Sequence, residues 1–351
     1  MSLDALLKAR IKSQGPLTIA EYMTECLLHP TYGYYTTRDP LGRTGDFITA
    51  PEVSQMFGEM LGLCLVQTWI DQDRPAPFAL AELGPGRGTL MRDILRATSA
   101  IPGFNEAAQI WLLEASPTLR ARQTEALGSA IRHIEKIDDL PDLPLFFVAN
   151  EFFDALPVRQ FVRDNGRWRE RHIGLLEDRL AFGLGPALPQ PALNDDADND
   201  LPGDFVEYAP GAAPAAAVLG ERIEARGGAG LIVDYGDWGG HGDTLQAVCG
   251  HQKTNPLEAP GQSDLTAHVN FKAIARATPC GVSRLCSQGV FLERLGITAR
   301  AQKLASALEG ERLDNHIAAH RRLTHPDEMG HLFKVLGLYP SKASPPPGLE
   351  T

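Results

Sequence analysis

A glycine-rich turn follows a short apolar segment, and its residue types suit a nucleotide-like ligand. Residues 78–83 read FALAEL, and GPGRGTL follows directly. Glycines let the backbone approach a ligand closely, and a helix that starts there presents free N–H groups. A P-loop would need Lys before Thr89, and the dinucleotide fingerprint fails at its sixth position, which Thr89 occupies. The pattern E-x-G-x-G-x-G fits completely, with Glu82, Gly84, Gly86 and Gly88.

The carboxylate at the start of this turn favours a cationic cofactor. A pyrophosphate beside Glu82 would be repelled by about 1–4 kcal/mol at 4 Å. S-adenosylmethionine carries a net charge of +1, so Glu82 suits its amino-acid end. Glu114 ends the next apolar segment, in WLLEASP, and can accept both ribose hydroxyls. These residues predict S-adenosylmethionine as the cofactor, although Glu114 alone does not separate it from a dinucleotide.

A third polar group follows another apolar segment, in the run Asn150-Glu151-Phe152-Phe153-Asp154. Ligands of open α/β sheets lie beyond the carboxyl ends of the strands, so these side chains are expected to point into the cofactor cleft. The alternative is a turn or helix cap made by Asn150 and Asp154. Glu151 is harder to explain by capping.

Other polar residues have simpler explanations. Thr49 and Glu52 fit a capping box that opens a helix, which leaves Asp46 as the unexplained acid of that segment and a candidate to face the substrate. Asp264 or Thr266 fits an N-cap. Tyr32, Tyr34 and Tyr35 fit either a peptide groove or a surface cluster. His268 has no partner at metal-ligand spacing, and His316 and His320, four residues apart on a helix, lack an accompanying Glu-x-x-His, so we predict no metal site.

The elements around these residues indicate a doubly wound α/β fold. Short apolar strands alternate with helices from about residue 76, which is typical of a parallel sheet with helices on both faces. The turn signals Asp164-Asn165-Gly166 and Glu177-Asp178 indicate inserted β-hairpins. We predict an N-terminal helical cap (1–75), a cofactor-binding domain (76–158 and 206–297), inserted hairpins with a loop (159–205), and C-terminal helices that end in a disordered Pro-rich tail (298–351).

Composition narrows the class of protein. The 351 residues carry a net charge of −11, which disfavours nucleic acid and anionic membrane surfaces as general partners. Five cysteines without a Cys-x-x-Cys pair favour neither disulfides nor zinc. The N-terminus has no apolar signal region, and no apolar run is long enough to span a bilayer. We expect a cytoplasmic protein, or one of the mitochondrial matrix in a eukaryote, and leave a homodimer open.

Seven segments, in order along most of the chain, resemble the MidA-like methyltransferases, whose mitochondrial members are complex I assembly arginine methyltransferases. Ala50 stands where Ser is usual in that family, a small departure. The segments are GDFITAPEVSQMFGE (45–59), ELGPGRGTLMRDILR (82–96), EASPTLRARQ (114–123), ANEFFDALPVRQF (149–161), VDYGD (233–237), GQSDLTAHVNF (261–271) and QGVFLERLGI (288–297).

The resemblance implies a class I methyltransferase sheet, S-adenosylmethionine, and a protein arginine substrate such as a subunit of NADH:ubiquinone oxidoreductase. On that basis Glu151 is the candidate guanidinium clamp, and Asp154 orients the substrate or takes the proton. Asn150 holds the cofactor end of the cleft, and Asp46 is the reserve candidate. Two alternatives stay open at this point: a non-catalytic assembly factor that binds the cofactor, and a small-molecule methyltransferase.

Overall fold

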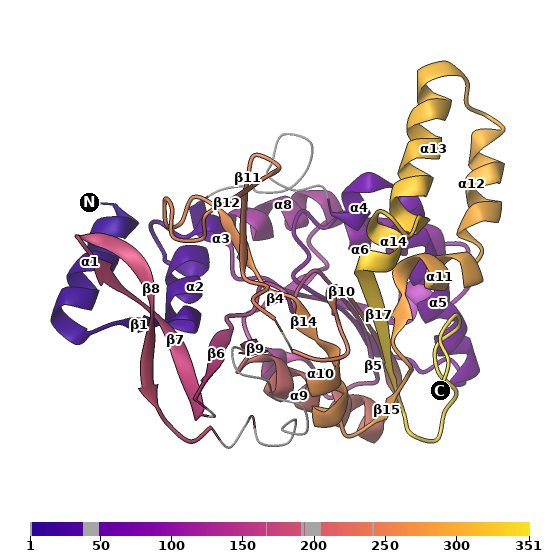
Figure 1. The fold of residues 1–351 in the computed structure, drawn as a ribbon. Helices are drawn as coiled ribbons and strands as arrows, with labels where there is room; N and C mark the ends of the chain where they lie inside the picture. The colour runs from indigo at the N-terminus through magenta and orange to yellow at the C-terminus, as the bar shows by residue number, and fades with distance from the viewer. Residues whose placement is uncertain (1, 38–48, 166, 191–192, 194–204, 241) are drawn as a thin grey trace.

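The computed structural model describes residues 2–37, 49–165, 167–190, 193, 205–240 and 242–351, and Figure 1 shows their arrangement. A large sheet with helices on both faces forms one side of the molecule, and the N-terminus lies with a smaller sheet on the other side. This is the α/β class expected from the sequence. None of the described helices is long and apolar enough to cross a membrane.

The large sheet has the strand order β15-β17-β10-β5-β2-β3-β4, with β14 added beside β10 and β16 beside β17. β2, β3, β4, β5 and β10 run parallel to their neighbours in this set, and β17 is antiparallel to β10. The strands are β2 (Phe78–Leu83), β3 (Ala108–Leu113), β4 (Arg132–Ile134), β5 (Leu145–Asn150), β10 (Gly228–Asp237), β14 (Val269–Asn270), β15 (Gly281–Val282), β16 (Cys286–Ser287) and β17 (Phe333–Tyr339).

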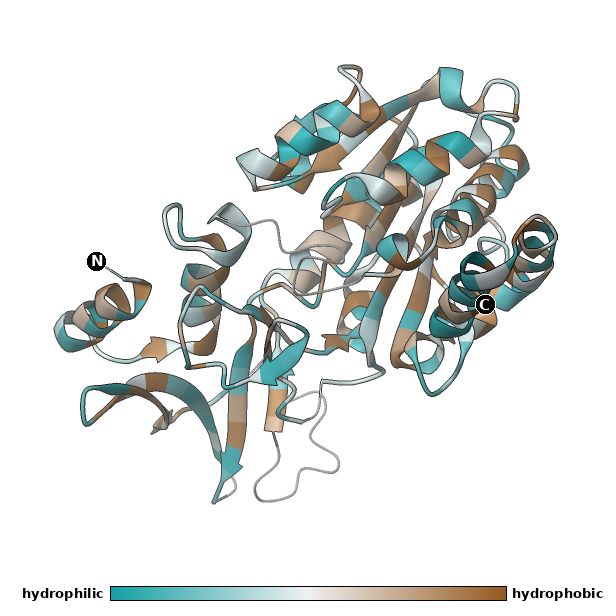
Figure 2. Cartoon of the chain, turned by 90° about the horizontal axis from the view of Figure 1, so that it is seen from above, coloured by the Kyte–Doolittle hydropathy of each residue, from teal (hydrophilic) through white to brown (hydrophobic). Residues whose placement is uncertain are grey.

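Each face of this sheet has its own hydrophobic core, because successive side chains of a strand point to opposite faces. On one face Phe78 and Leu80 pack with α5 (Gln55–Asp71), α6 (Thr89–Thr98) and α11 (Gln288–Arg294). On the other face Ala79 and Ala81 pack with α9 (Ala212–Arg226) and α10 (Phe271–Ala277). Figure 2 shows the interior strands largely in the hydrophobic colour and many outward-facing helical surfaces in the hydrophilic one.

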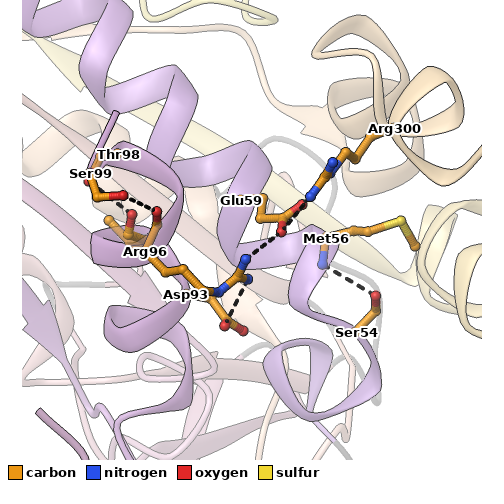
Figure 3. A network of polar contacts seen from close by, with 9 residues as sticks. Ser54, Met56, Glu59, Asp93, Arg96, Thr98, Ser99 and Arg300 are labelled. Carbon is orange, nitrogen blue, oxygen red and sulfur yellow. Dashed lines mark hydrogen bonds and ion pairs between the residues drawn. The ribbon is translucent and has the colours of Figure 1, made fainter. Parts of the chain in front are cut away.

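Further helices flank the sheet, and an ion-pair cluster around the buried Glu59 fixes one of them. They are α7 (Phe104–Ala107), α8 (Pro117–Leu127), the 3-10 turn Ile137–Asp139, α12 (Ile297–Ala305), α13 (Gly310–Thr324) and α14 (Met329–Leu332). Glu59 of α5 accepts from Arg96 of α6 at 3.0 Å and from Arg300 of α12 at 2.7 Å (Figure 3). Burial would raise the pKa of Glu59, but these two guanidinium groups lower it overall. The cluster ties α12 to the helices that cover the sheet.

The inserted hairpins form a second sheet that packs with the N-terminal helices. Its strands are β1 (Leu17–Thr18), β6 (Arg159–Asp164), β7 (Arg167–Leu176), β8 (Arg179–Ala187) and β9 (Phe205–Tyr208), all paired antiparallel. Positive φ angles at Asn165, Glu177 and Asp178 make the two expected turns. Helices α1 (Leu3–Gln14) and α2 (Ile19–Leu28) share a hydrophobic core with this sheet. A third sheet contains β11 (Gln246–Cys249), β12 (Gln252–Thr254) and β13 (Asp264–Thr266).

Two expectations for the C-terminal region are wrong. The C-terminal segment that was expected to be helical ends in β17, which pairs with β10 on one side and with β15 and β16 on the other. In a short, largely apolar segment such as FKVLGLY, periodicity does not distinguish a strand from a buried helix. The Pro-rich tail is ordered: Leu349 is only 8% exposed in the core, and the Arg284 N–H donates to the Glu350 carbonyl at 2.8 Å.

Two capping expectations are also wrong. Thr49 precedes α4 (Ala50–Val53), but its side chain makes no capping hydrogen bond. Ser54 has an extended backbone and separates α4 from α5. Asp264 and Thr266 lie in a strand, and the side chain of Asn270 caps α10 instead, accepting from the Ala273 N–H at 3.0 Å.

Candidate active site

A cleft of about 360 Å³ lies at the carboxyl ends of β2, β3 and β5. The strand order reverses direction between β2 and β5, and ligands of open α/β sheets bind at such a switch point. The register puts Leu83 beside both Leu113 and Ala149, so Gly84, Glu114 and Asn150 follow at the same edge. Three polar segments that are far apart in the sequence therefore meet at one opening.

The glycine turn has the left-handed backbone that its sequence suggested. The φ angles of Gly84, Gly86 and Gly88 are 69°, 54° and 79°. A Cβ atom at Gly84 would lie 3.2 Å from the ring of Phe152, so glycine there lets the turn approach the segment after β5. Gly88 caps α6, while the other two glycines line the cleft. The turn therefore places the N-terminus of α6 beside the cleft.

Glu82 is a buried carboxylate in this wall. It is 3% exposed, and its Oε2 atom has no hydrogen-bond partner among the described residues. Burial raises the pKa of Glu82 to about 8, although a backbone hydrogen bond from Met91 opposes the shift. A bound cation would favour the ionised form, because an opposite charge nearby offsets the loss of solvation.

Glu114 is oriented by its neighbours in the opposite wall. Its Oε1 accepts from the Ser116 N–H at 2.8 Å, and its Oε2 accepts from the Gln123 amide at 3.2 Å. The same amide donates to the Gly86 carbonyl at 2.6 Å. His133 Nε2 forms a hydrogen bond with Gln123 Oε1 at 2.8 Å. Gln123 therefore connects the glycine turn to Glu114, a link that was not predicted because Gln123 looked like one more polar residue of α8.

The end of β5 brings Asn150 to the cleft, and the segment after it brings Glu151 and Asp154, as expected. Asn150 donates to Glu151 Oε1 at 3.1 Å, and the Ala50 N–H approaches the same oxygen at 3.4 Å. Glu151 has a φ of 51°, a left-handed backbone conformation that is uncommon for non-glycine residues. Burial, and next the charge of Asp154, raise the pKa of Glu151 to about 8.

Asp234 of β10 holds this segment in place. One of its oxygens accepts from the N–H groups of Phe153 and Asp154 at 3.0 and 3.2 Å. Burial raises the pKa of Asp154 to about 6, which a hydrogen bond from the Tyr235 side chain partly opposes. The pKa of Asp234 is raised by burial and by the charges of Asp154 and Glu151. Asp234 was not singled out in the sequence, although it lies in the VDYGD motif.

The N-terminal segment closes the cleft from another side. Tyr35 of α3 (Tyr34–Thr37) lines it, and its hydroxyl donates to Asp264 Oδ1 at 2.8 Å. Glu52 lines it as well and accepts from the Thr89 hydroxyl at 2.6 Å, instead of completing a capping box. Asp46, the reserve candidate, lies outside the described residues.

The ionisable side chains of the described lining are mostly acidic. Arg87 is its one cationic side chain, whereas seven carboxylates line it: Glu52, Glu82, Glu114, Glu135, Glu151, Asp154 and Asp264. Within the described part of the chain, no three side chains of the metal-binding types could hold a metal ion. His316 and His320 contact Ala301 and Thr298 of α12, away from the cleft. A cationic ligand would favour the ionised form of these acids, so the lining suits cationic ligands.

The unpaired atoms of the cleft fit S-adenosylmethionine. Besides Glu82 Oε2, the buried atoms Asn150 Oδ1 and Asp154 Oδ1 have no hydrogen-bond partner among the described residues. All three are acceptors, and buried polar atoms of this kind are normally paired. A ligand with an ammonium group, a sulfonium and ribose hydroxyls supplies the donors and positive charge that these oxygens lack.

Comparisons with known proteins agree with this geometry. A profile of S-adenosyl-L-methionine-dependent methyltransferases matches residues 60–286. The protein arginine methyltransferase NDUFAF7 of Bos taurus is 38% identical, over 94% of this chain and 82% of the relative. Its Drosophila melanogaster homologue is 36% identical, over 97% and 85%. Both are named as mitochondrial.

A solved structure extends the agreement to the fold. It comes from Burkholderia thailandensis, is bound to S-adenosyl-homocysteine, and is 28% identical to this chain. The TM-score is 0.84, and the match covers 99% of this chain and 92% of the other. The strand order, the acceptor-rich cleft and these matches lead to one conclusion: the chain belongs to this family of S-adenosylmethionine-dependent methyltransferases, and S-adenosylmethionine is its cofactor.

Proposed function

We propose that this enzyme is a protein arginine N-methyltransferase. The observation that carries the proposal is the acidic lining of the cleft, where seven carboxylates face one cationic side chain among the described residues. The cofactor would pair with only some of these carboxylates, so the second substrate is expected to be cationic as well. A guanidinium is permanently charged and presents five N–H donors in a plane, which suits carboxylate partners. The names of the two NDUFAF7 relatives support the same substrate.

The cofactor end of the cleft is assigned to the residues that follow β2 and β3. The N–H groups of the turn with Gly84 and Gly86 hold the carboxylate of the cofactor, and Glu82 holds its ammonium group. Glu114 accepts the ribose hydroxyls, in the orientation that Gln123 and Ser116 give it. Asn150 contacts the cofactor from the end of β5. When bound, S-adenosylmethionine supplies a methyl group on a sulfonium that a nucleophile can attack in line.

The substrate end is assigned to the segment after β5. Glu151 binds the guanidinium and fixes its plane, because a carboxylate can accept two parallel N–H bonds. The positive charge of the guanidinium restores the ionised form of Glu151, which burial disfavours. Asp154, whose pKa is about 6, orients the guanidinium or accepts the proton that leaves the attacking nitrogen. Asp234 acts through the backbone of this segment and is a positioning residue.

The acceptor protein and the compartment belong to the same proposal. We propose a subunit of NADH:ubiquinone oxidoreductase as the first acceptor to examine, on the resemblance of the sequence motifs. The compartment that goes with it is the cytoplasm, or the mitochondrial matrix in a eukaryotic source.

Mass spectrometry of the proteome tests the proposed function. Wild-type and deletion strains are compared for methylated peptides, and the purified enzyme is added back to the deletion extract with S-adenosylmethionine. We expect a methyl-arginine that is lost on deletion and restored by the enzyme. A restored methyl group on lysine or on a carboxylate would refute the arginine substrate and leave the cofactor assignment intact. Methylation of small molecules alone would refute the protein substrate.

A further inference from the structure

A third carboxylate reaches the substrate end of the cleft from an element that is distant in the sequence. Asp264 is the first residue of β13, is 7% exposed, and lines the cleft. The Tyr35 hydroxyl donates to its Oδ1 atom at 2.8 Å, and Tyr35 lines the same cleft. The two residues are 229 positions apart, and α2, which contacts both α3 and β13, brings their elements together.

The backbone fixes Asp264 relative to the proposed substrate clamp. The Ala267 N–H, three residues further on, donates to the Asp154 carbonyl at 3.0 Å. This bond joins the end of β13 to the segment that carries Glu151 and Asp154. The groups also interact through their charges: after burial and Asp154, the charge of Asp264 is a further cause of the raised pKa of Glu151. Asp264 therefore faces the same part of the cleft as the two proposed catalytic carboxylates.

We propose that Asp264 is a second substrate-binding carboxylate of this enzyme and that Tyr35 is the residue that positions it. The inference rests on the proposed arginine function and deepens it. A planar guanidinium has donors on more than one edge, so carboxylates from two elements can bind it at once. Glu151 engages one edge and Asp264 another. A lysine ammonium is a compact point charge and gains less from two separated partners, so this arrangement selects arginine.

Steady-state kinetics of three variants tests the inference, with the acceptor protein found in the add-back experiment. Asp264→Asn keeps the shape and removes the charge, so KM for the acceptor should rise about 10-fold or more. The affinity for S-adenosyl-homocysteine, measured by calorimetry, should stay within twofold of wild type and shows that the variant is folded. Tyr35→Phe should raise the same KM less. Tyr32→Phe is the matched control, because Tyr32 contacts His29 and does not line the cleft.

A double-mutant cycle separates positioning from general structural support. If Tyr35 acts through Asp264, Tyr35→Phe should have little further effect in the Asp264→Asn background. Equal effects in both backgrounds would overturn the role of Tyr35, and an unchanged KM in Asp264→Asn would overturn the role of Asp264. The methylated residue is identified in the same reactions. Methyl-lysine there would refute the arginine function, and the KM comparison would still decide whether Asp264 binds the substrate.

Discussion

Replacing Glu151 by Gln gives the sharpest test of the proposed chemistry. The substitution keeps the size of the side chain and its contacts with Asn150 and Ala50, and it removes the charge that would hold a guanidinium. Turnover on the acceptor protein should fall at least ~100-fold, the lower range for lost acid–base groups. Binding of S-adenosyl-homocysteine should change little, because Glu151 is assigned to the substrate end.

The pH dependence of kcat/KM follows from the same residue. Burial and the charge of Asp154 raise the pKa of Glu151 to about 8, so the free enzyme holds a proton there at pH 7. A guanidinium binds the ionised form, so kcat/KM should rise with pH from about 6 and level off above about 8. This parameter reports the groups of the free enzyme. The residual activity of Glu151→Gln should lack that rise.

The stability of the ligand-free enzyme should change in the opposite direction. The pKa of Glu151 is raised on folding, so the native state keeps a proton that the unfolded chain releases near pH 4.3. Its contribution to stability is complete below that pH and is lost as the pH rises through about 8. One pKa unit corresponds to ~1.4 kcal/mol, which puts the ceiling near ~5 kcal/mol. Asp154 and Asp234 are buried in the same cluster and can hold protons in place of Glu151, which reduces the effect below this ceiling. We therefore expect Glu151→Gln to be more stable than wild type at pH 9 by about 1–3 kcal/mol.

The assays are methyl transfer from labelled S-adenosylmethionine, calorimetry, and urea unfolding at pH 5 and pH 9. Glu125→Gln is the matched control, because Glu125 is exposed on α8 and lies outside the cleft. Wild-type turnover in Glu151→Gln would refute the assignment of Glu151. A stability difference that is the same at both pH values would refute the pKa argument, whatever the effect on turnover.

Four further substitutions test the cofactor site and the fold. Gly86→Val should abolish binding of S-adenosyl-homocysteine in calorimetry, because a branched residue disfavours a φ of 54° and would enter the cleft; unchanged binding would remove the turn from the site. Glu114→Ala should weaken that binding by about 1–3 kcal/mol, unless the ribose is held elsewhere. Gln123→Leu should weaken it about 10-fold through the lost bonds to Gly86 and Glu114, and equal affinity would contradict this link. Glu59→Ala should lower the free energy of unfolding by about 1–3 kcal/mol in urea titrations without changing the affinity.

The parts of the fold that could be predicted from sequence are those with a local signal. β2 spans the apolar segment 78–83, and α6 begins directly after the glycine turn, as the sequence indicated. The register of a parallel sheet then brought Glu114 and Asn150 to the same edge as Gly84. β17 had no comparable signal, because its apolar run becomes a strand only by pairing with β10, about 100 residues earlier.

The same limit applies to the site. Asp264 looked like a helix cap because Asp is common at caps, and its strand depends on pairing with β11. Tyr35 could have belonged to a surface cluster, and only the bond to Asp264 resolves its position. Asp234 resembled any polar strand end, and its role follows from two backbone N–H groups on a segment 80 residues away. Side chains that act through distant partners leave no spacing pattern to find.

The acidic cluster is better explained by ligand binding than by stability. Burial raises the pKa of Glu151, Asp154 and Asp234, and the charge of Asp154 raises the pKa of Glu151 and of Asp234 further. Such an arrangement weakens the ligand-free fold as the pH rises, and sites of this kind persist where function requires them. A bound guanidinium, together with the cationic cofactor, would supply the positive charge that these groups lack. The free energy that the fold loses by burying three acids together is then available to favour cationic ligands.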